Sequence, residues 1–233
     1  MALRLEAVRF EVADALAVAA FWAELLGREV RTEPGGALVP GDDTQVGLRF
    51  AAAQREPAGR PRLHLHLTSD SPDHQRRTVE SVLRLGGRHL DVGQSPDDTH
   101  VVLADPGGNE LCVIEPGSDF LAGTGYLGEV TCDGSRNVGP FWRDALSWPL
   151  VWDKDEQTAI QSPLGGTKIS WDRWGDGSPA ERSGNRQRFD LVAADPAEET
   201  ERLIALGAIL RADGPNGMEL ADPDGNGFGL RAK

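Results

Sequence analysis

The sequence Ala104-Asp105-Pro106-Gly107-Gly108-Asn109-Glu110-Leu111-Cys112-Val113-Ile114-Glu115-Pro116 decides the fold, because a close variant of it follows near the C-terminus. That variant is Ala221-Asp222-Pro223-Asp224-Gly225-Asn226-Gly227-Phe228-Gly229-Leu230. In both copies an Asp-Pro pair opens a turn, a Gly-Asn pair supplies residues that tolerate positive φ, and a short apolar strand follows. The chain therefore contains one structural unit in two copies.

Two further landmarks recur in the same order. Phe21-Trp22 returns as Phe141-Trp142, and Leu85-Gly86 returns as Leu206-Gly207. The spacing between copies is about 120 residues at each landmark, which indicates an internal repeat. We expect a first module over residues 1–116, a glycine-rich linker over 117–125 and a second module over 126–233.

The first module opens with the pattern of a strand and then a helix. In residues 5–12 apolar and polar residues alternate, which predicts a strand with Val8, Phe10 and Val12 on one face. Asp14 is a favourable N-cap for a helix that Gly27 ends. Further helices are expected at 72–85, up to 146, and at 196–206. Further strands are expected at 28–32, 37–39, 45–51, 62–68, 89–92, 100–103, 110–114, 126–132, 150–152, 158–161, 168–171, 188–192, 209–212, 218–220 and 228–231.

Each module thus passes twice through a strand, a helix and a run of strands. This order predicts an α+β fold of two tandem βαβββ modules, whose half-barrels pair into a single-chain pseudo-dimer around a cavity.

Composition excludes several classes of partner. The chain of 233 residues carries a formal net charge of −13, which argues against binding to nucleic acid or to an anionic membrane. No leader or membrane-length apolar stretch is visible, so a cytoplasmic location is expected. The two cysteines, Cys112 and Cys132, form no disulfide framework and are expected to be reduced.

The landmarks together resemble the glyoxalase/bleomycin-resistance/dioxygenase superfamily, also called vicinal oxygen chelate. The resemblance rests on the order of elements, the Phe-Trp helix followed by Leu26-Gly27, the strand Arg62–Leu67, and Asp-Pro-x-Gly-Asn before the last strand. It covers nearly the whole chain as two tandem glyoxalase-like domains. It implies the fold more strongly than the reaction, because one fold hosts many functions.

Metalloenzymes of this superfamily hold a divalent metal with His, Glu or similar side chains, and the resemblance maps those positions onto this chain. In the first module they fall on Ala7, His64 and Cys112. In the second module they fall on Leu127, Arg188 and Gly229. This ligand set is incomplete, so no cofactor is predicted and the family's catalytic metal is not expected.

A displaced metal site is the alternative. His64 and His66 share a strand face, and Glu11, Glu110 or Cys112 could complete a mixed site beside them. The simpler interpretation is that these polar side chains line a wet cavity and form hydrogen bonds there.

The ligand-binding residues that we predict alternate with apolar residues on the strands. Arg188 and Asp190 stand where His64 and His66 stand in the first module, and they form an ion pair or orient a ligand. Trp171, and with it Trp174, either stacks on a flat or cationic ligand or packs in the core. The predicted ligand-binding set is Arg9, Glu11, His64, His66, Cys112, Trp171, Arg188 and Asp190.

The sequence thus predicts a protein that binds a small organic molecule in a cavity between β-sheets without a catalytic metal. The alternative is a metal-dependent lyase, isomerase or dioxygenase around His64 and His66, with Glu110 as a further ligand candidate. A third option is metal-free acid–base catalysis by His64, His66 or Glu11. Because the chain already holds two modules, it is expected to be a monomeric pseudo-dimer or a homodimer.

Overall fold

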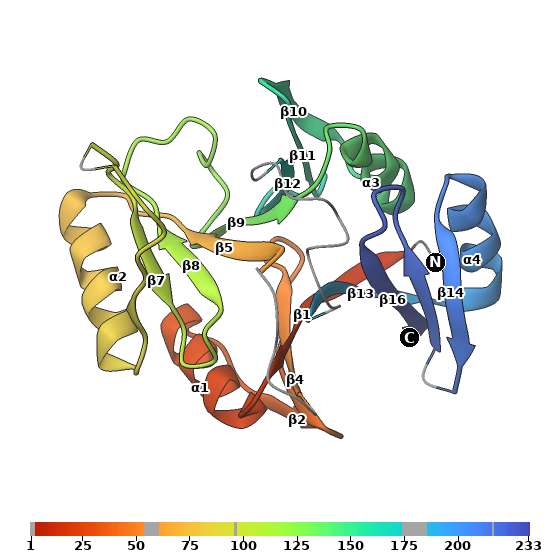
Figure 1. Ribbon diagram of the computed structural model, residues 1–233, viewed down its shortest axis with the longest axis horizontal. Helices are drawn as coiled ribbons and strands as arrows, with labels where there is room; N and C mark the ends of the chain where they lie inside the picture. Colours follow the sequence, from red (N-terminus) through yellow and green to blue (C-terminus); the bar gives the residue numbers. More distant parts are fainter. Residues whose placement is uncertain (1–2, 54–60, 96, 174–185, 216) are drawn as a thin grey trace.

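The computed structural model describes residues 3–53, 61–95, 97–173, 186–215 and 217–233. It contains four units, each with the order strand, helix and three strands (Figure 1). Unit one is β1 (Arg4–Val12), α1 (Ala15–Leu26), β2 (Arg31–Glu33), β3 (Gly36–Val39) and β4 (Gly47–Ala52). Unit two is β5 (Leu63–Leu67), α2 (Pro72–Arg84), β6 (Arg88–His89), β7 (Val101–Ala104) and β8 (Glu110–Val113). Unit three is β9 (Leu127–Asp133), α3 (Val138–Leu146), β10 (Leu150–Lys154), β11 (Gln157–Gln161) and β12 (Lys168–Asp172). Unit four is β13 (Gln187–Ala193), α4 (Pro196–Ala205), β14 (Ile209–Gly214), β15 (Gly217–Ala221) and β16 (Gly227–Ala232).

The strands form two sheets of eight strands, which we call sheet A and sheet B. Sheet A has the order β14-β15-β16-β13-β1-β4-β3-β2, and sheet B has the order β10-β11-β12-β9-β5-β8-β7-β6. Inside each unit the first and last strands are parallel, as β1 and β4 are, whereas the junctions β1–β13 and β5–β9 are antiparallel. Sheet A therefore joins units one and four, and sheet B joins units two and three. Each sheet takes half of its strands from each half of the sequence.

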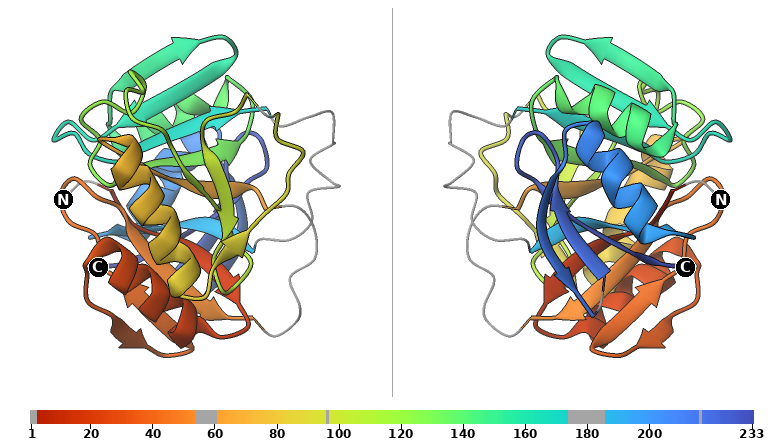
Figure 2. Two further views of the ribbon diagram at one scale, coloured as in Figure 1. Left: turned by 90° about the vertical axis from the view of Figure 1, so that its left-hand side faces the viewer. Right: turned by 90° about the vertical axis from the view of Figure 1, so that its right-hand side faces the viewer.

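The helices, in contrast, pair within each half of the sequence. The two side views show α1 beside α2 and α3 beside α4 (Figure 2). An ion pair of 3.0 Å joins Arg84 of α2 to Glu24 of α1, and Arg202 of α4 donates to the Ala145 carbonyl oxygen of α3 over 2.7 Å. The expected α+β fold with a single-chain pseudo-dimer is confirmed, and its two sheets run across the repeat.

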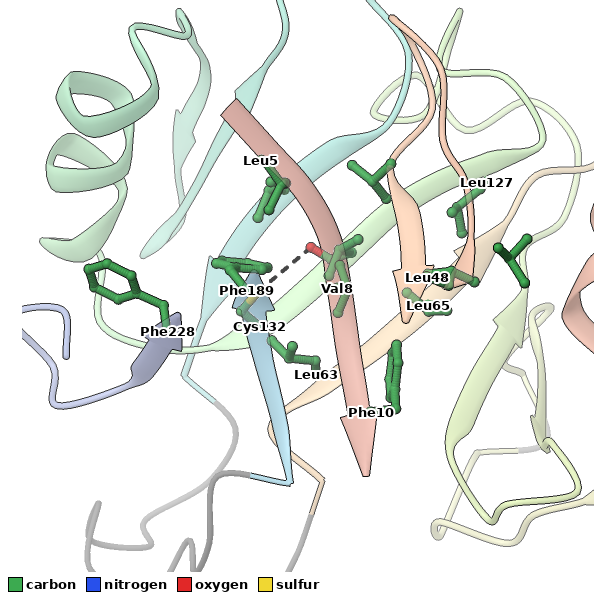
Figure 3. Packing of buried hydrophobic residues seen from close by; sticks show 14 of the residues in the cluster. Leu5, Val8, Phe10, Leu48, Leu63, Leu65, Leu127, Cys132, Phe189 and Phe228 are labelled. Atoms are coloured by element: carbon green, nitrogen blue, oxygen red, sulfur yellow. Dashed lines mark hydrogen bonds between the residues drawn. The ribbon is translucent and has the colours of Figure 1, made fainter. Parts of the chain in front are cut away.

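Side chains fill most of the space between the two sheets. Val8 and Phe10 of β1 meet Leu63 and Leu65 of β5 in one cluster of buried apolar residues (Figure 3). Val8 and Leu65 are 0% and 1% exposed. Because strand side chains alternate, the opposite, polar face of each sheet points away from this core. A cavity of about 20 Å³ remains between the sheets beside Leu63 and Phe189, and a larger cavity opens on a polar face, as described below.

The repeated Asp-Pro turns connect the two sheets. The buried Asp105 carboxylate, between β7 and β8, accepts a hydrogen bond from Trp22 Nε1 of α1 over 2.8 Å. Asp222, between β15 and β16, accepts one from Trp142 Nε1 of α3 over 3.2 Å. In the first half of the sequence, this contact links the helix of unit one to a turn of unit two. In the second half, it links the helix of unit three to a turn of unit four. Each contact thus joins an element of one sheet to an element of the other. The Phe-Trp and Asp-Pro landmarks therefore recur together because they are two sides of one contact.

Local signals at the start of the chain act as predicted. The Asp14 carboxylate accepts from the Ala17 backbone N–H over 3.0 Å, and Gly27 ends α1 in the left-handed region at a φ of 65°. The strand expected at 28–32 is shorter and begins at Arg31. The backbone N–H of Arg28 explains the difference, because it donates to Ala23 O of α1 over 2.8 Å and so completes the helix end.

Candidate functional site

A cluster of polar side chains lies on the polar face of sheet B, where β5, β8 and β9 are neighbours (Figure 1). His66 on β5 lies directly opposite Cys112 on β8 and Glu129 on β9. The two histidine rings of β5, His64 and His66, have centroids 4.8 Å apart. Leu63, Leu65 and Leu67 alternate with them and face the core. We call His64, His66, Cys112, Glu129 and Ser170 the sheet B cluster.

Glu129 organises this cluster. The residue is 2% exposed, and its carboxylate lies 2.6 Å from His66 Nδ1 and accepts a hydrogen bond from the Ser170 hydroxyl of β12. Burial alone would lower the pKa of His66, but the adjacent Glu129 carboxylate raises it. Burial and the neighbouring His66 hold the pKa of His64 well below its usual range. The Glu129 carboxylate therefore favours the protonated form of His66, a proton that a bound metal ion would displace, and burial favours the neutral form of His64.

The same cluster has donor atoms at the spacing of a metal site. A nitrogen from each of His64 and His66 and the Cys112 sulfur all lie within 4.8 Å of one another. Two imidazoles and a thiolate suit zinc or a similar divalent ion. Glu110, the other ligand candidate on β8, has its Oε1 3.7 Å from His64 Nδ1. The donor set of the sheet B cluster therefore fits a divalent metal.

The ligand sets mapped along the sequence are divided by the fold. Ala7 and Glu11 lie on β1 in sheet A, whereas His64 and Cys112 lie in sheet B. Glu11 therefore cannot complete a site with His64 and His66, because the core separates the two polar faces. The sequence interpretation missed Glu129, whose signal was a carboxylate in the middle of the strand Leu127–Asp133, between the apolar residues Leu127 and Val130.

Sheet A carries a different set of polar residues, including four of those predicted, Arg9, Glu11, Arg188 and Asp190. Of the two roles predicted for Arg188 and Asp190, the ion pair is present, with Arg188 Nε 3.2 Å from Asp190 Oδ1. The centre of the polar residues on sheet A is Arg49 of β4, which is 7% exposed and which the sequence interpretation missed. Arg49 bonds the carboxylates of Glu6, Glu33 and Asp190 at 2.7, 2.8 and 2.7 Å. Although burial alone would lower the pKa of Arg49, these carboxylates raise it above its ordinary value.

A cavity of about 550 Å³ opens on this polar face of sheet A. The charged residues that line it are four arginines and three carboxylates: Arg9, Arg49, Arg188, Arg231, Glu33, Asp190 and Glu219. Part of its wall is Gly229 of β16, where an added Cβ would lie 3.3 Å from Asp190 Oδ1. A larger side chain at this point would press on the Arg188–Asp190 pair and extend into the cavity.

Trp171, a predicted ligand-binding residue, contributes to the core. Trp171 is 1% exposed and stacks on Trp142, with ring centroids 6.3 Å apart and an angle of 7° between the rings. Its strand, β12, directs Ser170 to the polar face and Trp171 to the apolar one. Of the two interpretations of Trp171, core packing matches this geometry, so Trp171 is not carried into the ligand site. Trp174 lies outside the described residues.

Within the described part of the chain, no helix is both long and apolar enough to cross a membrane. The sequence matches the family model of a glyoxalase-like domain twice, over residues 7–114 and 129–231. The fold is similar to glyoxalase I from Zea mays, with a TM-score of 0.68 and 16% identity, covering 98% of this chain and 92% of that one. It is also similar to a putative dioxygenase from Bacillus subtilis subsp. subtilis str. 168, with a TM-score of 0.58 and 12% identity, covering 98% of this chain and 84% of that one. No curated protein sequence matches the chain.

Proposed function

Because the chain belongs to the glyoxalase-like domain family, we propose that it binds a small organic molecule on the polar face of sheet A, without a catalytic metal at that site. The observation that carries the proposal is the cavity of about 550 Å³ described above. Its volume lies in the range of about 300–1,000 Å³ that is typical of small-molecule sites, although its lining is more charged than that of most such sites. The cavity is also built on paired strands, which hold its side chains in fixed positions.

The residues at the mapped metal positions of sheet A support a site without metal. Ala7, Arg188 and Gly229 offer a methyl group, a guanidinium and no side chain at all. A guanidinium stays protonated in proteins and does not act as a metal ligand. Ala7 is buried and Gly229 lines the cavity, so neither offers a donor atom, and the neighbouring charged groups provide hydrogen bonds to orient a ligand.

A substitution that fills the cavity tests this proposal. In Gly229→Leu the new side chain occupies the cavity wall, whereas in the control, Gly214→Leu, it stands on the exposed strand β14 of the same sheet. Thermal unfolding is measured for both variants and the parent with a panel of small acids, amides, amines and phenols. We expect some compounds to raise the unfolding temperature of the parent and of Gly214→Leu, but not of Gly229→Leu. Equal shifts in all three proteins would reject the cavity as the binding site.

A second candidate function, metal-dependent chemistry, is favoured by the short spacing of donor atoms in the sheet B cluster. His64, His66 and Cys112 would hold the ion, and the Glu129 carboxylate would orient His66. A bound divalent ion would supply a Lewis acid that polarises a substrate oxygen. The reaction classes that this candidate covers are those of a lyase, an isomerase or a dioxygenase.

Elemental analysis of protein purified without an affinity tag tests the second candidate. The parent is compared with a His64→Ala, His66→Ala double variant and with the control His89→Ala, whose histidine is exposed. About one equivalent of metal in the parent and the control, lost in the double variant, would support the metal site. A parent that remains metal-free after incubation with zinc, nickel, iron and manganese would reject it.

A further inference from the structure

We infer that the ligand of the sheet A cavity is an organic anion, whose carboxylate binds the guanidinium of Arg9. This inference rests on the proposed function, because it names the chemical class of the ligand at that site. It is carried by the arrangement of three arginines on neighbouring strands and by the unequal way in which the protein compensates their charges.

The three arginines form a row across the centre of sheet A. Arg9 of β1 is in register with Arg49 of β4 on one side and with Arg188 of β13 on the other. Side chains directly opposite each other on neighbouring strands lie close together, and like charges at such positions destabilise a sheet. The row therefore requires negative charge near each of its members.

Two members of the row receive that charge from the protein. Arg49 bonds three carboxylates at hydrogen-bond distance. Arg188 bonds Asp190 at 3.2 Å and Glu219 at 3.0 Å. Both flanking arginines are thus fixed by carboxylates of the same sheet.

Arg9, the middle member, is treated differently. Its nearest carboxylate within the described residues is Glu11, whose Oε1 is 3.9 Å from Arg9 NH2, too far for a hydrogen bond. The buried Nε of Arg9 has no hydrogen-bond partner among the described residues. The side chain is nevertheless 28% exposed and lines the cavity, so a ligand can reach it. An anion in the cavity would pair with the exposed part of the guanidinium, where no carboxylate of the described residues lies within hydrogen-bond distance.

The charge of the cavity agrees with an anionic ligand. Four arginines and three carboxylates line it, although the whole protein carries a net charge of −13. With Glu6, which pairs with Arg49 and Arg231 of this lining, positive and negative groups balance around the cavity, whereas the molecule as a whole is strongly negative. A carboxylate suits this position because its two oxygens match the parallel N–H groups of a guanidinium.

Matched pairs of acids and amides test the inference by titration calorimetry. The pairs are benzoate and benzamide, phenylacetate and phenylacetamide, and salicylate and salicylamide, which keep the ring and change the charge. We expect at least one acid to bind the parent about tenfold more tightly than its amide, because a hydrogen-bonded ion pair is lost in the amide. No acid exceeding its amide in any pair would overturn the inference.

Two arginine variants assign the effect to Arg9. Arg9→Met keeps the length of the side chain and removes the charge, and Arg77→Met does the same on the exposed surface of α2. Acid binding should weaken about tenfold in Arg9→Met and stay unchanged in Arg77→Met. Unchanged acid binding in Arg9→Met would overturn the inference. So would an unfolding temperature of ligand-free Arg9→Met well below that of Arg77→Met, because it would show that the protein itself already compensates the charge of Arg9.

Two further arms separate this inference from its premise. If amides bind the parent as tightly as acids, and Gly229→Leu abolishes both, the cavity binds small molecules and only the anionic class is overturned. If Gly229→Leu changes nothing, the proposed function fails as well. Inorganic phosphate serves as a competitor of the acid. If phosphate displaces the acid only at phosphate concentrations far above the dissociation constant of the acid, the result supports a carboxylate ligand. If phosphate binds more tightly than the acid, the assignment of a carboxylate is overturned.

Discussion

Replacing Asp105 by alanine should destabilise the protein more than most single substitutions do. The Asp105 carboxylate accepts hydrogen bonds from Trp22 Nε1 at 2.8 Å and from the backbone N and side-chain Nδ2 of Asn109, both at 2.9 Å. Each buried donor left without an acceptor costs about 1–3 kcal/mol, so three of them cost about 3–5 kcal/mol when they are not fully additive. We expect a loss of this size in the free energy of unfolding.

Urea denaturation followed by tryptophan fluorescence measures this loss, with the midpoint multiplied by the slope of the transition. Asp105→Asn keeps one acceptor oxygen and should lose less than Asp105→Ala. The control is Asp43→Ala at an exposed position, which should change stability by less than about 0.5 kcal/mol. If Asp105→Ala also loses less than about 1 kcal/mol, the contact between turn and helix does not hold the sheets together, and the reasoning is refuted.

Three further predictions concern stability and reactivity. Burial raises the pKa of Asp222 to about 6, so the protonated carboxyl stabilises the fold fully below the unfolded pKa of about 4, and this contribution is lost as the pH rises through 6. In urea denaturation the parent should lose up to roughly 3 kcal/mol more than Asp222→Asn between pH 4 and pH 6. A stability difference between the two proteins that does not change with pH would refute this prediction. Arg49→Leu leaves three carboxylates facing one another and should lower the free energy of unfolding by about 3–5 kcal/mol at neutral pH. The loss should be smaller in acid, where the carboxylates are protonated. A loss that does not depend on pH in the same assay would contradict the ion-pair network. Burial raises the pKa of the Cys132 thiol, which makes it unreactive in the folded protein. After treatment with iodoacetamide, mass spectrometry should find Cys132 unalkylated in the folded protein and alkylated in urea. Rapid alkylation of Cys132 in the folded protein would show that the core opens easily.

The order of elements was predictable because its signals are local. Asp14 as N-cap and Gly27 as helix end act within one turn of chain, and strand alternation in residues 5–12 depends only on neighbours. The repeat was visible for a similar reason, since the Trp22 and Asp105 landmarks need specific residue types for their contact. These features give the elements and the fold without knowledge of which strands meet.

The site was less predictable because strand pairing is not local. His64 and Cys112 were correctly placed near each other, but Ala7 and Glu11 belong to the other sheet. Alternation assigns a side chain to a face and does not say which strand lies beside it. Glu129 joins His66 only because β9 pairs with β5, and this pairing connects the two halves of the sequence.

The antiparallel junctions β1–β13 and β5–β9 have one more consequence, which concerns symmetry. If two separate copies of one half-sequence assembled in the same way, a twofold axis would relate the two sheets and make them identical. A single chain that contains both halves has no such constraint, because every strand of sheet A has its own codons, separate from those of sheet B. One sheet can therefore carry a histidine and cysteine cluster while the other carries a row of arginines. Fusion of the halves thus permits two chemically different faces on one symmetric scaffold.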